Sequence, residues 1–132
     1  MIELKNISFA YGKKTVLSNI SFTAFDGECV GILGNNGSGK STLITCINRI
    51  KTPSSGEVYI DGKSVQSMNR NERARHIAYV AQKNEICQIT VFDSVLLGRR
   101  PYIKWAMTQE DIELCATMIH RVGLGKFQLR NL

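Results

Sequence analysis

The chain has 132 residues, 43% of them hydrophobic, which is enough for one modest domain and too few for two. Its 17 basic and 11 acidic residues give a formal net charge of +6, which permits an anionic partner without identifying one. No apolar stretch reaches about 18 residues and the N-terminus lacks the pattern of a secretion signal, so a cytoplasmic location is expected.

The first part of the chain predicts an antiparallel pair of strands. Apolar and polar residues alternate over residues 2–9 and again over 15–25, and Tyr11 and Gly12 lie at the turn between them. The pair Asp-Gly that follows turns the chain into an apolar run at residues 28–33, which is typical of a buried strand.

A glycine-rich loop lies between this predicted strand and a helix expected over about 41–50, where apolar residues recur at helical spacing. The loop consists of Gly34, Asn35, Asn36, Gly37, Ser38, Gly39, Lys40, Ser41 and Thr42. Its glycines let the backbone turn N–H groups toward phosphate oxygens, and the start of the helix adds a positive dipole end. Lys40 is placed to reach the β- and γ-phosphates and Ser41 to bind Mg²⁺. The loop therefore predicts a site for a nucleoside triphosphate, and the alternative is a glycine-rich turn that matches by chance.

The middle of the chain predicts short elements. The sequence at residues 53–56 breaks the chain, residues 57–60 form a short strand, and a tight Asp-Gly turn follows. A short polar helix is expected at 69–76, and a buried strand at 77–81.

A loop at residues 83–89 and two helices complete the prediction. Thr90 and Asp93 resemble an N-terminal capping box, as do Thr108 and Asp111, so helices are expected at about 90–98 and 108–122. Gly123 is expected to end the second helix.

Neither the cysteines nor the basic residues predict a functional site. The four cysteines, Cys29, Cys46, Cys87 and Cys115, show no Cys-x-x-Cys spacing and lie mostly in apolar runs. Reduced core thiols are therefore favoured over metal ligands or disulfides. The basic residues form no stripe interleaved with aromatic residues, so a solvated surface is favoured over nucleic-acid binding.

The order of these motifs resembles the ATP-binding subunit of an ABC transporter over the whole chain. Residues 8–12 are similar to the family's aromatic loop, 34–42 to its Walker A motif, 52–58 to the turn after its first helix and 79–82 to its Q-loop. The resemblance implies an α/β fold, a P-loop NTPase of ABC type. Residues 1–132 would be the N-terminal portion of one such domain, incomplete. They would hold the β-subdomain, part of the parallel-sheet core and the start of the helical subdomain from about residues 83–90.

The same resemblance implies roles for two residues outside the loop. Tyr11 would stack on the adenine of ATP, and the alternative is a tyrosine on the surface at a strand end. Gln82 would offer its amide oxygen to Mg²⁺ and the attacking water, and the residues after it would sense a membrane partner. The role of Gln82 rests on its family position alone.

Residues 90–102 are similar to the start of the helical subdomain in importers of iron chelates, haem and cobalamin. In such importers this region meets the membrane permease, so the protein would lie peripherally on the inner face of the membrane. Arg99, Arg100 and Trp105 are candidates for that interface. The alternative is a plain amphipathic helix ending at Gly98.

Three family motifs are missing from the sequence: the Leu-Ser-Gly-Gly-Gln signature, the Walker B strand with its Asp-Glu pair, and the switch histidine. His76 and His120 follow no suitable strand, and the apolar run 87–93 follows the Q-loop too closely to be Walker B. Complete subunits pair head to tail, with each signature capping the other subunit's γ-phosphate. Hydrolysis by this chain alone is therefore not expected, whereas ATP binding is. Because the missing strands would lie between the Walker A and Q-loop strands, unpaired edges and an uncovered apolar face are predicted.

Two other functions remain open. One is a truncated nucleotide-binding module that does not hydrolyse ATP, and the other is an ABC-type protein that acts on nucleic acid, which only the net charge suggests. A GTPase is disfavoured because no Asn-Lys-x-Asp motif is present.

Overall fold

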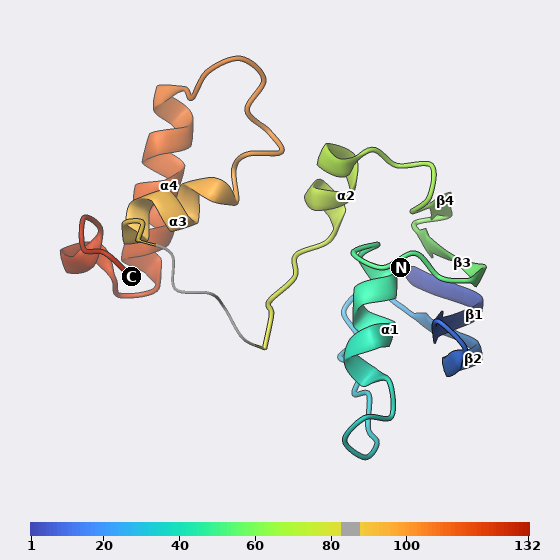
Figure 1. Ribbon diagram of the computed structural model, residues 1–132. Coiled ribbons are helices and arrows are strands. Elements are labelled where there is room, and N and C mark those ends of the chain that lie inside the picture. The colour runs from blue at the N-terminus through green and yellow to red at the C-terminus, as the bar shows by residue number, and fades with distance from the viewer. Residues whose placement is uncertain (83–87) are drawn as a thin grey trace. The chain divides into compact units, whose positions relative to one another are not determined.

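The computed structural model describes residues 1–82 and 88–132, which form two compact units, residues 1–69 and 70–132 (Figure 1). Each unit has buried apolar residues of its own. Most of the loop expected at 83–89, and with it Cys87, lies outside the described residues.

The first unit is built on a four-stranded antiparallel sheet with the strand order β2-β1-β3-β4. Its strands are β1 (Ile2–Tyr11), β2 (Lys14–Ala24), β3 (Ser55–Ile60) and β4 (Lys63–Ser64). The predicted hairpin is confirmed, because β1 pairs with β2 from Ile2↔Ala24 to Tyr11↔Lys14. The predicted strand at 57–60 is also confirmed, and it pairs with β1.

A bulge bends β1 near its middle and brings β3 close to it. Asn6 has a φ of 54°, and the register of β1 shifts against both neighbours around it. The backbone N–H of Asn6 donates to Ser21 Oγ at 2.8 Å instead of to a strand carbonyl. Gly56, at a φ of 83°, lies so close that a methyl group there would be 2.3 Å from the carbonyl oxygen of Asn6. This close backbone approach needs a glycine.

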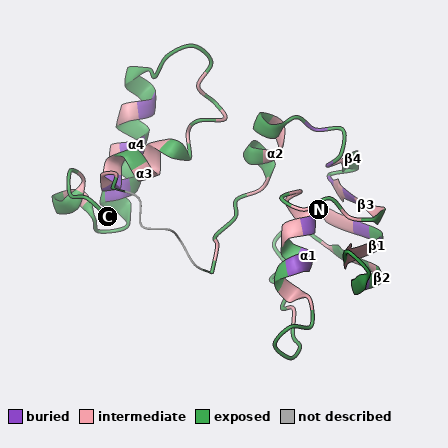
Figure 2. Cartoon of the chain, in the orientation of Figure 1, coloured by how far each residue is buried: buried purple, intermediate pink, exposed green. Residues whose placement is uncertain are grey.

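Helix α1 (Lys40–Ile47) lies beside the sheet (Figure 1), and it confirms the predicted helix, although it ends three residues before the expected end. The backbone leaves the helix at Asn48, the C-cap, and Arg49 has a φ of 55°. Figure 2 shows the buried positions of this unit on α1, on the strands and on the segment between β4 and α2. The buried apolar side chains are Leu4, Ile7, Leu17, Leu43, Cys46, Val58, Ile60, Val65 and Met68.

Two predicted strands are wrong. Residues 28–33 and 77–81 are irregular in the structure, and no strand among the described residues pairs with either. A strand needs a neighbour to satisfy its backbone N–H and C=O groups, so an apolar run without one does not form a ladder. The side chains are correspondingly exposed, with Leu33 at 94% and Val80 at 87%. This exposure agrees with the predicted uncovered apolar surface.

The second unit is helical. It contains α2 (Arg70–His76), α3 (Val91–Leu97), α4 (Gln109–Arg121) and the short 3₁₀ helix η1 (Gly125–Phe127). The three predicted helices are therefore confirmed, with ends that differ by one residue. Val91, Cys115 and Ile119 are the buried apolar residues.

The N-terminal caps of α3 and α4 differ. Thr108 and Asp111 form the complete reciprocal capping box at the start of α4, as predicted. At α3 only half of the box forms: the N–H of Asp93 donates to Thr90 Oγ1 at 3.1 Å, and the Thr90 hydroxyl donates to the Asp93 carboxylate. Gly123, at a φ of 76°, ends α4 as predicted, with its N–H bonded to the carbonyl of His120.

The cysteine prediction is wrong in one place. Cys46 and Cys115 are buried free thiols, but Cys29 is exposed because it lies in the irregular segment 28–33. His76 and His120 are exposed, as expected for helix-face histidines. Over the described ranges, no helix combines the length and the apolar character that crossing a bilayer requires.

Candidate nucleotide-binding site

The glycine-rich loop leads directly into α1, and its backbone geometry is that of an anion cradle. Gly37 and Gly39 have φ values of 82° and 96°, which side-chain-bearing residues rarely adopt. Gly39 is the N-cap of α1 and provides no side-chain hydrogen bond to the helix, and the first turn carries no acidic residue. The first N–H groups of α1 therefore stay available to a negatively charged group at the positive end of the helix dipole.

Packing against β2 fixes the end of the loop. A methyl group at Gly39 would lie 3.0 Å from side-chain carbons of both Val16 and Leu17. At the other end of the loop, a methyl group at Gly34 would lie 2.7 Å from Ser38 Oγ. The loop path is therefore set by close contacts as well as by φ, and Gly39 is the tighter position because β2 backbone also lies nearby.

The ammonium group of Lys40 spans the loop. Its Nζ donates to the carbonyl oxygens of Gly34 at 2.7 Å and Asn35 at 2.8 Å. An ammonium group has three donors, so one N–H is left for another acceptor. The charge thus lies beside the same cradle that the first amides of α1 face.

The two hydroxyl residues after Lys40 differ in environment. Ser41 is exposed, whereas Thr42 is buried with only 9% of its surface accessible. Thr42 Oγ1 lies 3.5 Å from the hydroxyl of Tyr11, which is a long hydrogen bond across to the end of β1. The structure therefore brings Tyr11 beside the first turn of α1, and its stacking on adenine stays a prediction.

Aromatic and cationic neighbours surround Tyr11. The ring of Phe9 meets it edge-to-face, with centroids 4.9 Å apart and planes at 82°. Lys51 Nζ lies 5.0 Å from the centre of the Tyr11 ring. The hydrogen bond with Thr42, followed by the nearby Lys51 ammonium, lowers the pKa of Tyr11. Tyr11 remains 49% exposed, so the ring keeps accessible surface for a planar ligand.

Gln82 belongs to the second unit, where it is exposed. The loop and Gln82 lie in different units. The assignment of Gln82 to Mg²⁺ and the attacking water stays a prediction.

The residues present fit Mg²⁺ only as part of a nucleotide complex. The part of the chain that the structure describes holds no cluster of three or more His, Cys, Asp or Glu side chains suited to a metal. The Ser41 hydroxyl offers one oxygen, and Mg²⁺ is commonly bound by one or two protein oxygens together with substrate phosphates. Mg²⁺ would therefore arrive with the triphosphate.

The sequence carries no signal for the residues that surround the predicted site. Lys51 is far from Tyr11 in the chain, and it reaches the ring only because the chain turns back after α1. Val16 and Leu17 were predicted as strand residues, without a role under Gly39. No short motif marks any of these positions, because each depends on how α1 lies against the sheet.

The loop, the helix start and the antiparallel sheet beside them define a P-loop nucleotide-binding protein. A family model described as ABC transporter matches residues 17–132. The chain therefore belongs to the ABC transporter family, in its ATP-binding domain.

Individual relatives agree with this assignment. The chain is 41% identical over 130 residues to the uncharacterized ABC transporter ATP-binding protein MJ0089 of Methanocaldococcus jannaschii, covering 98% of this chain and 51% of that protein. It is 38% identical over 112 residues to the petrobactin import ATP-binding protein YclP of Bacillus subtilis, covering 84% of this chain and 44% of that protein. The chain thus spans about half the length of these curated relatives.

Solved structures confirm the predicted fold class. The ATP-binding cassette MJ0796, in a dimeric post-hydrolysis state bound to ADP and Pi, matches with a TM-score of 0.81 and 27% identity, covering 99% of this chain and 61% of that one. A nucleotide-free ATP-binding cassette from an ABC transporter matches with a TM-score of 0.83 and 25% identity, covering 99% and 57%. The chain therefore has the fold of part of an ABC-type P-loop NTPase.

Proposed function

We propose that this chain binds MgATP as the N-terminal portion of the ATP-binding subunit of an ABC import system. The observation that carries the proposal is the juxtaposition of three features: the uncapped start of α1, the Lys40 ammonium lying across the loop, and Tyr11 beside Thr42. Together they offer backbone donors and a cation to phosphates, and an aromatic ring to a base, within one unit.

Each group of the proposed site binds a different part of MgATP. The loop amides and the first N–H groups of α1 bind phosphate oxygens, and Lys40 contributes a charge-assisted hydrogen bond. Ser41 supplies a hydroxyl oxygen to Mg²⁺, which neutralises phosphate charge. The ring of Tyr11 stacks on the base, which favours a planar ligand without reading its edge.

The complete subunit would couple ATP binding and hydrolysis to uptake. Two relatives support import: YclP is named for petrobactin import, and PhnC of Wolinella succinogenes for phosphonates import. We assign the transported compound to the class of iron-siderophore complexes, haem or cobalamin, on the similarity of residues 90–102. Hydrolysis would require a second ATP-binding subunit and the motifs that this sequence lacks.

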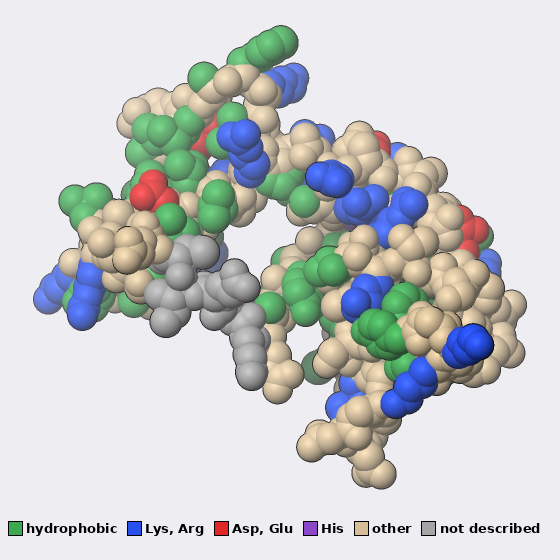
Figure 3. Space-filling view, in the orientation of Figure 1, with side chains coloured by type: hydrophobic (Ala, Val, Ile, Leu, Met, Phe, Trp, Pro, Cys, Tyr) green, Lys and Arg blue, Asp and Glu red, His purple; other side chains and the backbone are tan. Residues whose placement is uncertain are grey.

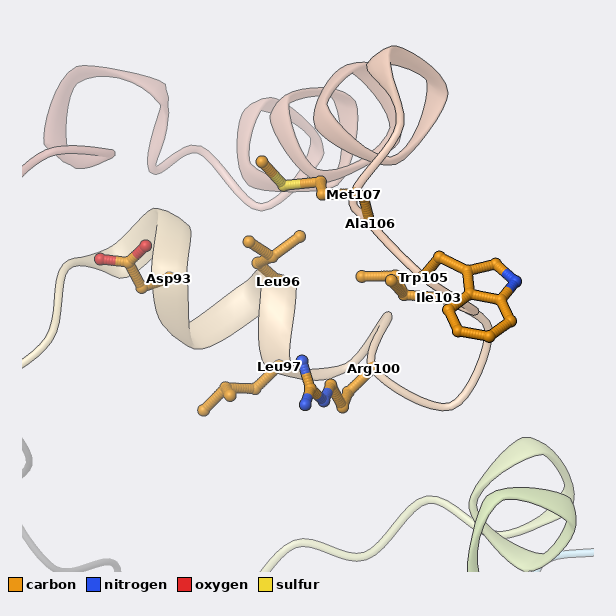
Figure 4. Close-up of a pocket in the computed structure, with 8 residues that line it drawn as sticks. All are labelled: Asp93, Leu96, Leu97, Arg100, Ile103, Trp105, Ala106 and Met107. Carbon is orange, nitrogen blue, oxygen red and sulfur yellow. The ribbon is translucent and has the colours of Figure 1, made fainter.

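The permease would dock on the second unit, in the region after Gln82. There α3 and the segment before α4 line a groove of about 340 Å³ (Figure 4). In that view Leu96 extends from α3 toward the segment that carries Met107, and both residues line the groove. Trp105, at 99% exposure, lies at its rim with Arg100. Exposed apolar surface with a cation beside it suits a protein partner.

Nucleic acid is a weaker candidate. Figure 3 shows Lys and Arg side chains on the visible face of each unit. Along the sequence the basic residues form no stripe interleaved with aromatic residues, so a small anionic ligand and a protein partner are favoured over nucleic acid.

The proposal is tested by calorimetric titration of the whole chain with MgATP. We expect saturable binding that Lys40→Ala weakens by about 10- to 100-fold, the loss of one charge-assisted hydrogen bond of about 1.5–3 kcal/mol. Tyr11→Ala should weaken it by about 5- to 100-fold, the loss of one stacked base at about 1–3 kcal/mol. Lys126→Ala, which removes the same charge from the second unit, is the matched control. No binding, or binding that Lys40→Ala leaves unchanged, would contradict the proposal.

A further inference from the structure

Lys51 has no assigned role, yet its ammonium lies on the aromatic pair that flanks the nucleotide loop. Its Nζ is 5.0 Å from the ring centre of Tyr11 and 5.9 Å from that of Phe9. Over residues 1–82 and 88–132, no carboxylate forms an ion pair with Lys51. Its charge is therefore directed to the rings.

The backbone around Lys51 is held at several points. The N–H of Lys51 donates to the carbonyl of Thr45 in α1 at 2.9 Å, and the N–H of Ile50 donates to Asn48 Oδ1 at 3.1 Å. Just after it, the N–H of Ser54 donates to the carbonyl of Ser8 in β1 at 2.8 Å. The segment is thus tied both to the helix that begins at the loop and to the strand that carries the aromatic pair.

Three contacts together orient the ring of Tyr11. Phe9 meets it edge-to-face, the Thr42 hydroxyl lies 3.5 Å from its own hydroxyl, and Lys51 lies over it. Since Tyr11 is still 49% exposed, these contacts fix the direction of its ring without burying the residue. A ring held in place loses less freedom when a ligand stacks on it than a ring that rotates freely.

We propose that Lys51 is a positioning residue for the nucleobase: its ammonium holds the Tyr11 ring beside the phosphate loop in the orientation in which the base of ATP stacks. The inference rests on the proposed function, because it concerns the same site. The attraction between a cation and an aromatic face is the physical basis, and either Lys or Arg can supply it. A role through the ring predicts that Lys51 matters only for ligands that carry a base.

The test compares MgATP with magnesium tripolyphosphate, which has the phosphates and no base, by calorimetric titration of the whole chain. Lys51→Met keeps an unbranched side chain that is only one atom shorter and removes the charge. We expect it to weaken MgATP binding about threefold to tenfold and to leave tripolyphosphate binding unchanged. Lys51→Arg should restore most of the MgATP affinity. Lys126→Met is the matched control for the loss of one charge.

A double-mutant cycle separates positioning from general electrostatics. In a Tyr11→Ala background, Lys51→Met should have no further effect on MgATP binding, because the ring through which it acts is gone. Equal losses for both ligands would mean that Lys51 contacts phosphate and would overturn the inference. So would unchanged MgATP binding in Lys51→Met. Absence of MgATP binding by the unaltered chain would instead overturn the proposed function, and the inference with it.

Discussion

Gly56 offers a direct test of how the sheet is built. A methyl group there would lie 2.3 Å from the carbonyl oxygen of Asn6 and 2.4 Å from that of Lys5, both backbone atoms of the neighbouring strand. Gly62, in the turn before β4, has a similar φ of 76° but no atom within 4 Å of the position of a methyl group. Gly56→Ala and Gly62→Ala thus share the conformational cost and differ only in the contact.

The magnitudes follow from that difference. A left-handed φ costs an alanine about 1–2 kcal/mol, and the stiffer unfolded chain offsets about 0.4–1 kcal/mol, so Gly62→Ala should lower the free energy of unfolding by about 1 kcal/mol. In Gly56→Ala the strand must also move by about 1 Å, which breaks neighbouring β1–β3 hydrogen bonds at about 1 kcal/mol each. It also loosens the burial of Val58, which is 3% exposed. A total loss of about 4 kcal/mol or more is expected.

The assay is urea denaturation of both variants, followed by circular dichroism. The expected result is a small decrease in the midpoint for Gly62→Ala and a large one, or no folded state, for Gly56→Ala. Equal decreases in the two urea midpoints would refute the reasoning, because the close approach of β3 to the bulge of β1 would then not affect the free energy of unfolding.

Three further predictions concern the loop and α4. Gly39→Ala should weaken MgATP binding more than Gly34→Ala in calorimetry, because a methyl group at Gly39 meets β2 whereas one at Gly34 meets only the movable Ser38 side chain. Thr108→Ala removes the N-cap of α4 and should lower the free energy of unfolding by about 1 kcal/mol in urea denaturation. Hydrogen bonds from the Thr108 backbone and hydroxyl, and then from Arg99, lower the pKa of Asp111 in the folded protein. The ionised carboxylate therefore stabilises the fold fully at pH values above its unfolded-state pKa. This stabilisation is lost as pH falls through the folded-state pKa. Urea midpoints should therefore decrease below about pH 4, and less steeply in Asp111→Asn.

Local signals in the sequence predicted much of the structure. Thr108, Asp111 and Gly123 mark the ends of α4 because caps satisfy backbone groups within a few residues of themselves. The hairpin of β1 and β2 and the loop before α1 were also predicted from local signals, namely apolar-polar alternation and the spacing of glycines. The geometry of the glycine-rich loop depends on the φ values of its own glycines. The candidate site could therefore be located in the sequence before the fold was known.

The failures share a physical cause, which is dependence on distant partners. Residues 28–33 and 77–81 have the composition of buried strands, but composition does not supply the neighbour to which a strand must bond. Cys29 is exposed as a result. Lys51 is the opposite case, a contact that forms without having been predicted. Nothing in its local sequence indicates that the turn after α1 will place it over Tyr11. Local sequence patterns do not predict contacts between segments that are distant in the chain.

The two irregular apolar segments, residues 28–33 and 77–81, expose the chain to chaperones and proteases in a cell. Short irregular stretches with large accessible side chains, such as Leu33 and Val80, are what holdase chaperones bind and what proteases cleave. The nucleotide loop begins directly after the first of these segments, at Gly34. Chaperone capture of residues 28–33 would therefore hinder ATP binding at the loop that follows them. Cellular abundance and nucleotide occupancy should consequently rise and fall together.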